Sequence, residues 1–125
     1  MQEKIIRWVR AGHEPAIVFD PNSDSFEELA GRGMALGVFE DVDYEVSERK
    51  VEPGQIIVIG TDGIWETRNL KGKRFGKDLF RKIIQNHADG PAKKIVKEVI
   101  DALERFRHPL EQEDDVTLVV SKIEA

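Results

Sequence analysis

The residues best suited to chemistry begin with Asp62, which directly follows a run of apolar residues. Residues 55–60 predict a buried strand because the side chains on both of its faces are apolar. A carboxylate at the end of a rigid strand is held in place, as metal coordination requires. Gly63 lets the backbone turn sharply there and leaves space beside the carboxylate. The alternative is an ordinary Asp-Gly turn that ends a strand, and this segment by itself favours that alternative.

A second acidic segment, residues 111–115, directly precedes the last apolar run of the chain. Four of its five side chains are carboxylates, those of Glu111, Glu113, Asp114 and Asp115. They repel one another unless solvent or a cation relieves them, and Mg²⁺ and Mn²⁺ prefer such oxygen ligands. By itself the segment is better explained as a solvated acidic loop. Each segment nevertheless places an Asp at a strand end, and neighbouring strands would bring Asp62 and Asp114 into one cluster.

Two further segments contain residue types that occur in catalytic and binding sites. His13 lies in a Gly-Pro turn and would suit a base or a ligand, but a surface turn residue is the better explanation. Residues 31–37 contain three glycines whose amides would approach a phosphate. They lack the Gly-Lys-Ser/Thr ending of a P-loop, so a flexible loop is favoured. Trp8 and Trp65 are interpreted as core residues rather than as residues that stack on a ligand.

These candidates need strands and helices to position them, and the chain predicts strands first and helices later. Short β-branched or alternating runs predict strands at residues 5–9, 16–19, 44–51, 55–60 and 116–123. Apolar residues at helical spacing predict helices at residues 75–84 and 92–106. Residues 12–15 indicate a hairpin-type turn between the first two strands. An Asp or Gly cap at residues 89–91 would open the second helix, and His108-Pro109 would end it. The order predicts an α+β fold with a mostly antiparallel sheet.

Length and composition limit the class of protein. The chain has 125 residues, enough for one domain, and a net charge of −5, which argues against broad nucleic-acid binding. It has no Cys, so it has no disulfide framework and no thiolate zinc site. The apolar run at residues 56–59 is far shorter than the roughly 20 residues of a membrane helix. The N-terminus also lacks the apolar stretch of a signal peptide. We therefore expect no membrane association and a cytoplasmic location.

Several short motifs occur in an order that resembles one family. They are Ala-Gly-His-x-Pro at 11–15, Leu-Gly-Val at 36–38, Pro-Gly-x-Ile at 53–56, Thr-Asp-Gly-x-x-Glu-x-x-Asn at 61–69, Phe-Gly at 75–76, Ala-Asp-Gly-Pro at 88–91 and Asp-Asp-Val-Thr-Leu-Val-Val at 114–120. Their order resembles the C-terminal half of bacterial metal-dependent serine/threonine phosphatases, in the SpoIIE/RsbU branch of the PPM family. The match runs from about residue 5 to residue 123. The Thr-Asp-Gly and Asp-Asp-x-Thr motifs are its most specific parts.

The resemblance implies a fold, a reaction and a set of site residues. The fold is an α-β-β-α sandwich, and the reaction is hydrolysis of phosphoserine or phosphothreonine by water activated between two Mn²⁺ or Mg²⁺ ions. By the match of motifs, Asp62 and Asp114 correspond to metal ligands, and Gly63 gives room at the metal centre. Asp115 stands where relatives often have Asn, which implies a supporting role behind the ligands. The usual substrate in this branch is a phosphorylated regulatory protein of a partner-switching pathway, of the anti-sigma factor antagonist type.

One motif of the family is missing from the sequence. The N-terminal half of the family carries an Asp-x-x-Gly-His-Gly motif whose Asp bridges both metals, and Gly12-His13 matches a different segment. We therefore expect residues 1–125 to form a single partial domain that lacks the N-terminal metal-binding half. It would bind at most one Mn²⁺ or Mg²⁺ weakly, show little or no activity, and expose one apolar face. Three explanations stay open: a fragment of a larger phosphatase, a natural half-domain that forms a homodimer or pairs with another chain, and a non-catalytic interaction module.

Overall fold

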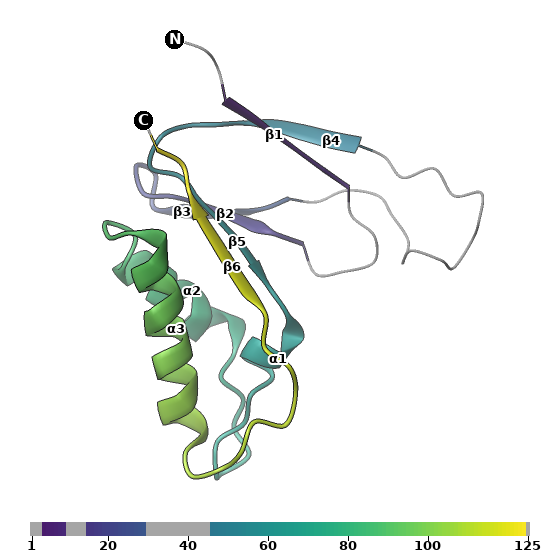
Figure 1. Ribbon diagram of the computed structural model, residues 1–125, viewed down its shortest axis with the longest axis vertical. Coiled ribbons are helices and arrows are strands. Elements are labelled where there is room, and N and C mark those ends of the chain that lie inside the picture. The colour runs from purple at the N-terminus through teal and green to yellow at the C-terminus, as the bar shows by residue number, and fades with distance from the viewer. Residues whose placement is uncertain (1–3, 10–14, 30–45, 125) are drawn as a thin grey trace, which may run out of the picture.

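The computed structural model describes residues 4–9, 15–29 and 46–124 of the chain (Figure 1). In chain order its elements are β1 (Lys4–Val9), β2 (Ile17–Asp20), β3 (Ser25–Glu28), β4 (Val46–Val51), β5 (Ile56–Gly60), α1 (Asp62–Trp65), α2 (Lys77–Asn86), α3 (Ala92–Arg107) and β6 (Leu118–Lys122). The predicted order of strands, two long helices and a closing strand is confirmed. The strand β3 and the short helix α1 are additions that the sequence patterns do not predict.

Four strands form one antiparallel sheet in the order β3-β2-β5-β6, and β1 and β4 form a separate antiparallel pair. The predicted hairpin between the first two strands is therefore wrong. β1 pairs instead along its whole length with β4, where Arg7 and Glu48 form an ion pair of 3.0 Å across the register. The true hairpin joins β2 to β3. In its turn the Asp20 carboxylate accepts a hydrogen bond of 2.9 Å from the backbone N–H of Asn22.

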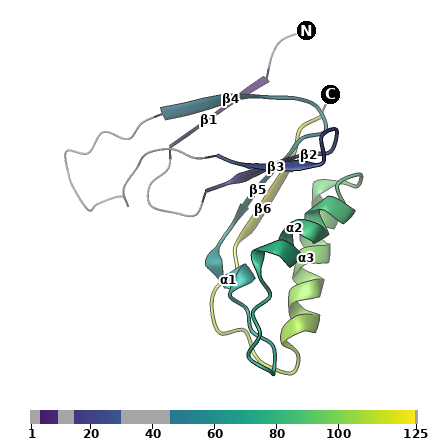
Figure 2. The ribbon, with the colours of Figure 1, turned by 180° about the vertical axis from the view of Figure 1, so that it is seen from behind.

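The elements lie in three layers. The helices α2 and α3 cover one face of the four-stranded sheet, and the β1–β4 pair lies on the side of that sheet away from the helices (Figure 1, Figure 2). A helical layer, a four-stranded sheet and a second small sheet match the predicted α+β class. They also match three of the four layers of an α-β-β-α sandwich.

The core lies between the helices and the four-stranded sheet. From the sheet side, Ile56 and Val58 of β5 are 0% and 1% exposed. From the helix side, Ile84 of α2 and Ile95 and Val99 of α3 are each 0% exposed. Burying an aliphatic side chain of this size stabilises the fold by about 1.5–3 kcal/mol. The periodic apolar residues that predict the helices are thus the residues that hold them on the sheet.

The second long helix begins and ends as its flanking residues dictate, with one difference from the prediction. Its N-cap residue is Pro91, and no side chain caps it, so the predicted Asp or Gly cap is wrong. The Lys122 ammonium instead donates hydrogen bonds of 2.9 Å to the carbonyl oxygens of Ala88 and Gly90. This contact fixes the α2–α3 connection to β6. The predicted end is confirmed, with His108 as the C-cap residue. No helix within the described residues is long and apolar enough to cross a membrane.

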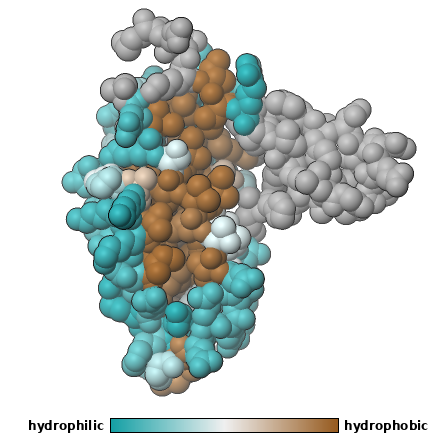
Figure 3. Space-filling view, in the orientation of Figure 1, coloured by the Kyte–Doolittle hydropathy of each residue, from teal (hydrophilic) through white to brown (hydrophobic). Residues whose placement is uncertain are grey.

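The other face of the four-stranded sheet is only partly covered. Ile59 of β5 pairs with Val119 of β6, and the two side chains are 48% and 50% exposed. On the same face, Val18 of β2 is only 1% exposed. Figure 3 shows hydrophobic residues gathered over β5 and β6. The prediction that β5 is buried on both faces therefore holds for the helix side alone. Ile59 and Val119 match the apolar face that the sequence predicts to be exposed.

Candidate metal centre

The two segments with the predicted site residues meet where β5 ends and β6 begins. The antiparallel ladder closes with Gly60 opposite Leu118. It continues through Thr61, whose backbone N–H donates to the carbonyl oxygen of Thr117 at 3.2 Å. In return the Thr61 hydroxyl oxygen accepts a hydrogen bond of 3.0 Å from the backbone N–H of Thr117. This junction brings the backbone before Asp62 against the backbone that follows the acidic segment.

The position of Asp62 is fixed by α1, a helix of only four residues. Asp62 is its first residue, and its carbonyl oxygen accepts a hydrogen bond of 2.9 Å from the backbone N–H of Glu66. Ile64 anchors the helix in the core with 0% exposure. Trp65 packs on Phe80 of α2, with 5.8 Å between ring centroids. The exposed Asp62 side chain thus stands on a turn that the core holds in place.

Gly63 allows α1 and the acidic segment to approach closely. A Cβ at this position would lie 2.1 Å from the backbone carbonyl oxygen of Asp115, which real side chains do not tolerate. The carbonyl oxygen of Gly63 also accepts a hydrogen bond of 2.6 Å from the Thr67 hydroxyl. The space beside Gly63 is therefore occupied at least in part by the Asp115 backbone. Its predicted role in making room at a metal stays a prediction.

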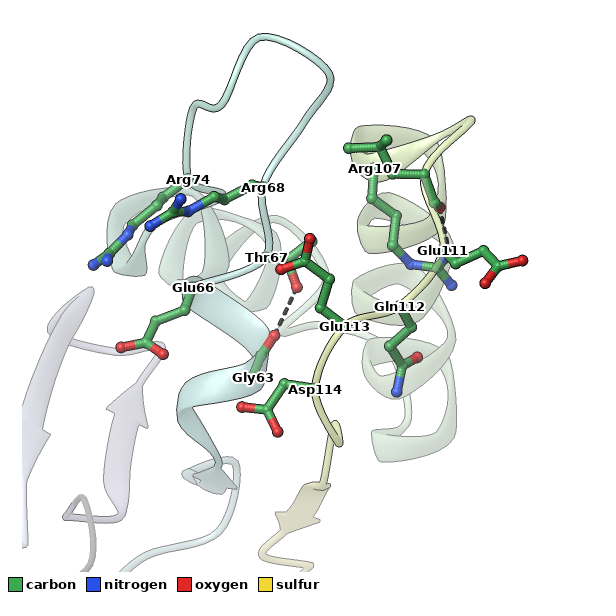
Figure 4. Close-up of a pocket in the computed structure, with 11 residues that line it drawn as sticks. Gly63, Glu66, Thr67, Arg68, Arg74, Arg107, Glu111, Gln112, Glu113 and Asp114 are labelled. Carbon is green, nitrogen blue, oxygen red and sulfur yellow. Dashed lines mark hydrogen bonds between the residues drawn. The ribbon is translucent and has the colours of Figure 1, made fainter.

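The acidic segment leaves α3 and forms one wall of a cavity of about 300 Å³ (Figure 4). Arg107 of α3 donates a hydrogen bond of 3.2 Å to the carbonyl oxygen of Leu110, which fixes the start of the segment. The Asp114 carboxylate accepts a hydrogen bond of 2.8 Å from the backbone N–H of Asp115. Gly63, Glu66, Glu111, Glu113 and Asp114 line the cavity together with three arginines, Arg68, Arg74 and Arg107. Asp62 lies outside this lining.

The carboxylates of this junction are of the ligand type that hard divalent cations prefer. Asp62, Asp114 and Asp115 are exposed, so their carboxylate oxygens are open to an ion from solvent. Mg²⁺ is commonly held by one or two carboxylates and keeps several of its waters. Within the described ranges, no group of three or more His, Cys, Asp or Glu side chains is placed to hold a metal ion. Asp62 and Asp114 as ligands, with Asp115 behind them, stay predictions on this evidence of backbone proximity.

A basic loop lines the same cavity as the acidic segment, and the sequence analysis does not single it out. Residues 67–75 form a small hairpin, here called the basic hairpin, in which Arg68 and Arg74 are bridge partners. The Asn69 carboxamide oxygen accepts hydrogen bonds from the backbone N–H groups of Lys71 and Lys73, at 3.0 and 2.9 Å. The backbone N–H of Gly72, which has a φ of 80°, donates to the carbonyl oxygen of Asn69 at 2.9 Å. The Asn-x-x-Gly spacing is typical of a type I turn, and this is the sequence signal that predicts the hairpin.

Two of the segments weighed from the sequence, His13 and residues 31–37, lie outside the described residues. Trp65 is half-buried against the core, as predicted for it.

Comparisons with known proteins first define the class. The structure superposes with a TM-score of 0.76 on the RsbU and RsbW domains of Rv1364c from Mycobacterium tuberculosis, at 20% identity, over 99% of this chain and 34% of that one. It superposes with a TM-score of 0.70 on the Mn-presoaked phosphatase domain of SpoIIE from Bacillus subtilis, at 18% identity, over 99% of this chain and 52% of that one. The fold is thus that of PP2C-type, or PPM, phosphatase domains.

Sequence comparisons then give the family. Residues 1–124 match the family model of stage II sporulation protein E, SpoIIE, and the chain belongs to that family. It is 32% identical over 120 residues to phosphoserine phosphatase RsbU of Bacillus subtilis strain 168, a match that covers 96% of this chain. The chain spans 35% of the length of that relative.

Proposed function

We propose that this chain is part of a metal-dependent phosphatase domain that hydrolyses phosphoserine or phosphothreonine in a partner protein. The observation that carries the proposal is the Thr61–Thr117 junction, which sets the start of α1 against the acidic segment. It is the same pair of segments that the motifs match to the metal ligands of the family. The name of the RsbU relative, a phosphoserine phosphatase, supports the substrate class.

Within this proposal each site residue has a distinct task. Asp62 and Asp114 would hold a Mn²⁺ or Mg²⁺ ion between two strand ends that the sheet keeps rigid. Asp115 would orient the segment through its backbone, which the close approach at Gly63 fixes. A metal bound there supplies a water of lowered pKa and offsets the charge on phosphoryl oxygens. The protein's part would be to hold the two carboxylates on α1 and on the segment that enters β6.

The substrate we propose is a small phosphorylated regulatory protein of a partner-switching pathway in the bacterial cytoplasm, such as an anti-sigma factor antagonist. The Mycobacterium tuberculosis relative supports this proposal because its structure contains an RsbU domain and an RsbW domain in one protein.

Metal binding tests the proposed site directly. We expect the chain to bind one Mn²⁺ weakly in calorimetric titrations, and we expect Asp62→Asn with Asp114→Asn to abolish the binding heat. The matched control is Asp78→Asn with Asp89→Asn, which removes two exposed carboxylates elsewhere and should leave the heat unchanged. The same heat from the wild type and the Asp62/Asp114 variant would refute these two residues as ligands.

Activity tests how complete the site is. We expect the chain by itself to hydrolyse a phosphoserine peptide slowly or not at all, because its sequence contains no Asp-x-x-Gly-His-Gly motif. Rapid Mn²⁺-dependent hydrolysis that Asp62→Asn abolishes would overturn this expectation and would show that the present residues suffice.

A second candidate function is a non-catalytic half-domain that binds a partner or a second copy of itself. The half-exposed pair Ile59 and Val119 favours it, because soluble monomers rarely leave large apolar patches uncovered. Sizing chromatography combined with the metal titration separates the two functions. A dimer that binds no Mn²⁺ would favour the interaction module over the phosphatase.

A further inference from the structure

The basic hairpin carries a concentration of positive charge that is unusual for this chain. Residues 67–75 contain four Lys or Arg and no Asp or Glu, in a protein whose net charge is −5. The side chains of Arg68, Lys71, Lys73 and Arg74 are all exposed. None of these four forms an ion pair with any residue that the structure describes. The hairpin is therefore a positive surface that has no direct ion-pair partner among the described residues, although carboxylates line the same cavity.

Two of these positive side chains, those of Arg68 and Arg74, lie next to each other. Arg68 and Arg74 are direct partners in the antiparallel bridge, and side chains at such positions lie on the same face of the ribbon with their Cβ atoms about 5 Å apart. Figure 4 shows both guanidinium groups extending in the same direction. Like charges in this arrangement destabilise the hairpin. An anionic group between them would remove that cost, and two planar guanidinium groups are well suited to bind a carboxylate.

The hairpin also projects an apolar side chain and stands beside the candidate metal centre. Leu70, at the corner of the turn, is 68% exposed. Arg68 and Arg74 line the same cavity as Asp114 (Figure 4). Asn69 fixes the shape of the loop through its two hydrogen bonds to the backbone, so the backbone that carries the charges does not have to be ordered on binding. A molecule that reached the acidic segment would meet the basic hairpin at the same time.

We propose that the basic hairpin is a docking surface for acidic side chains on the phosphoprotein substrate, next to its phosphorylated residue; this inference rests on the function proposed above. A single phosphate group held by Arg68 and Arg74 would leave the charges of Lys71 and Lys73 without a partner. The hairpin presents four unpaired cations around an exposed leucine, and that surface fits a protein with several carboxylates and an apolar contact. The phosphoryl group itself belongs on the opposite wall, where a metal would stand at Asp114. The basic hairpin would thus select the partner protein, and the acidic wall opposite would hold the site at which the phosphoryl group is hydrolysed.

Fluorescence anisotropy with three labelled peptides tests the proposal. The first has phosphoserine flanked by Asp and Glu, the second has the same flanks around an unmodified Ser, and the third has phosphoserine flanked by Gly and Asn. Measurements in EDTA keep metal binding out of the readout. We expect both acidic peptides to bind the wild-type chain and the third to bind at least about tenfold more weakly, because its charge is confined to one group. The affinity for the acidic peptides should fall as salt screens the charges.

Two double variants test whether the acidic peptides bind to the basic hairpin. Arg68→Gln with Arg74→Gln should weaken the binding of both acidic peptides about tenfold, which corresponds to about 1.4 kcal/mol. The matched control, Lys82→Gln with Lys93→Gln, removes two exposed positive charges from α2 and α3 and should keep the wild-type affinity. Circular dichroism should show that both variants remain folded, with thermal unfolding no lower than that of the wild type.

Three results would overturn the proposal. Acidic peptides that bind the hairpin variant as tightly as the wild type would exclude the hairpin. An equal loss in the control variant would show attraction to net charge alone. Tight binding of the third peptide that depends on Arg68 and Arg74 would assign the pair to the phosphate group. Each result leaves the Mn²⁺ titration of Asp62 and Asp114 untouched, so failure of the docking surface is distinguishable from failure of the proposed phosphatase function.

Discussion

The two faces of the four-stranded sheet carry similar residues in very different surroundings. On the helix side, Ile56 and Val58 of β5 are 0% and 1% exposed beneath α2 and α3. On the other side, Ile59 of the same strand and its partner Val119 are 48% and 50% exposed. The apolar character of β5 is therefore the same on both faces, and the helices bury only one of them.

This difference shows that an apolar strand sequence does not by itself mean that both faces of the strand are buried. The elements that pack on each face decide whether it is. The uncovered part of the second face is local, since Val18 on the neighbouring strand β2 is 1% exposed. Ile59 and Val119 lie at the ends of β5 and β6 that lead into Asp62 and the acidic segment. The half-exposed apolar pair and the candidate metal centre thus occupy the same end of the sheet.

Among the substitutions considered, the largest loss in the free energy of unfolding is expected on the helix side of the sheet. Ile56→Ala should lower the free energy of unfolding by about 2–5 kcal/mol, because it leaves a cavity under two helices. The matched variant on the other face is Ile59→Ala, which removes a side chain that is already 48% exposed and should cost about 1 kcal/mol or less. Urea unfolding followed by circular dichroism gives both values. Equal losses would contradict the contrast between the faces.

The next variant asks whether close packing on the helix side extends to the site. Gly63→Ala places a Cβ where the Asp115 carbonyl oxygen now lies, so α1 or the acidic segment has to move. We expect a loss of about 1–3 kcal/mol in the free energy of unfolding. Gly90→Ala is the control, because a Cβ there meets no atom nearer than 3.5 Å. A loss at Gly63 no larger than at Gly90 would show that the acidic segment yields freely.

The sequence predicts the parts of the fold that periodicity controls. Helices α2 and α3 follow from apolar residues at helical spacing, because those residues are the ones buried on the sheet. The place of Asp62 just after a strand follows from the apolar run before it, whereas its role as a metal ligand stays a prediction. The Asp62 and Asp114 segments meet because β5 and β6 are neighbours, as the strand-end argument predicts.

Other parts depend on contacts between distant residues or on very short elements. β3 is a four-residue strand with a single partly buried side chain, Phe26, so its sequence carries no alternation to detect. α1 is equally short and is held by Ile64 in the core rather than by its own propensity. The partner of β1 is decided by pairing with β4 over a long stretch of chain, which no local turn signal reveals.

A smaller loss of stability is expected from substitutions on the partly uncovered face of the sheet. Ile59→Thr with Val119→Thr should change the free energy of unfolding by about 1 kcal/mol or less, because both side chains are half-exposed. The double variant should also reduce any self-association seen in sizing chromatography, since it removes the apolar pair. Val18→Thr is the comparison on the same face, and it should cost more because it buries a hydroxyl. An equal loss from Val18→Thr and from the double variant would mean that the whole face is covered in solution.

The smallest effect is expected on the outer surface of α3, which neither face of the sheet touches. Lys97 and Asp101 form an ion pair of 2.7 Å one helical turn apart, and the hydrogen bond with Asp101, followed by its charge, raises the pKa of Lys97 above its ordinary 10.5. A raised lysine pKa stabilises the fold at pH values below 10.5, and this contribution disappears as the pH rises through the higher folded-state value. Lys97→Met should therefore lower the Tm slightly at neutral pH, and the difference from the wild type should vanish in alkaline buffer. A difference that persists there would come from the packing of the side-chain stem rather than from its charge.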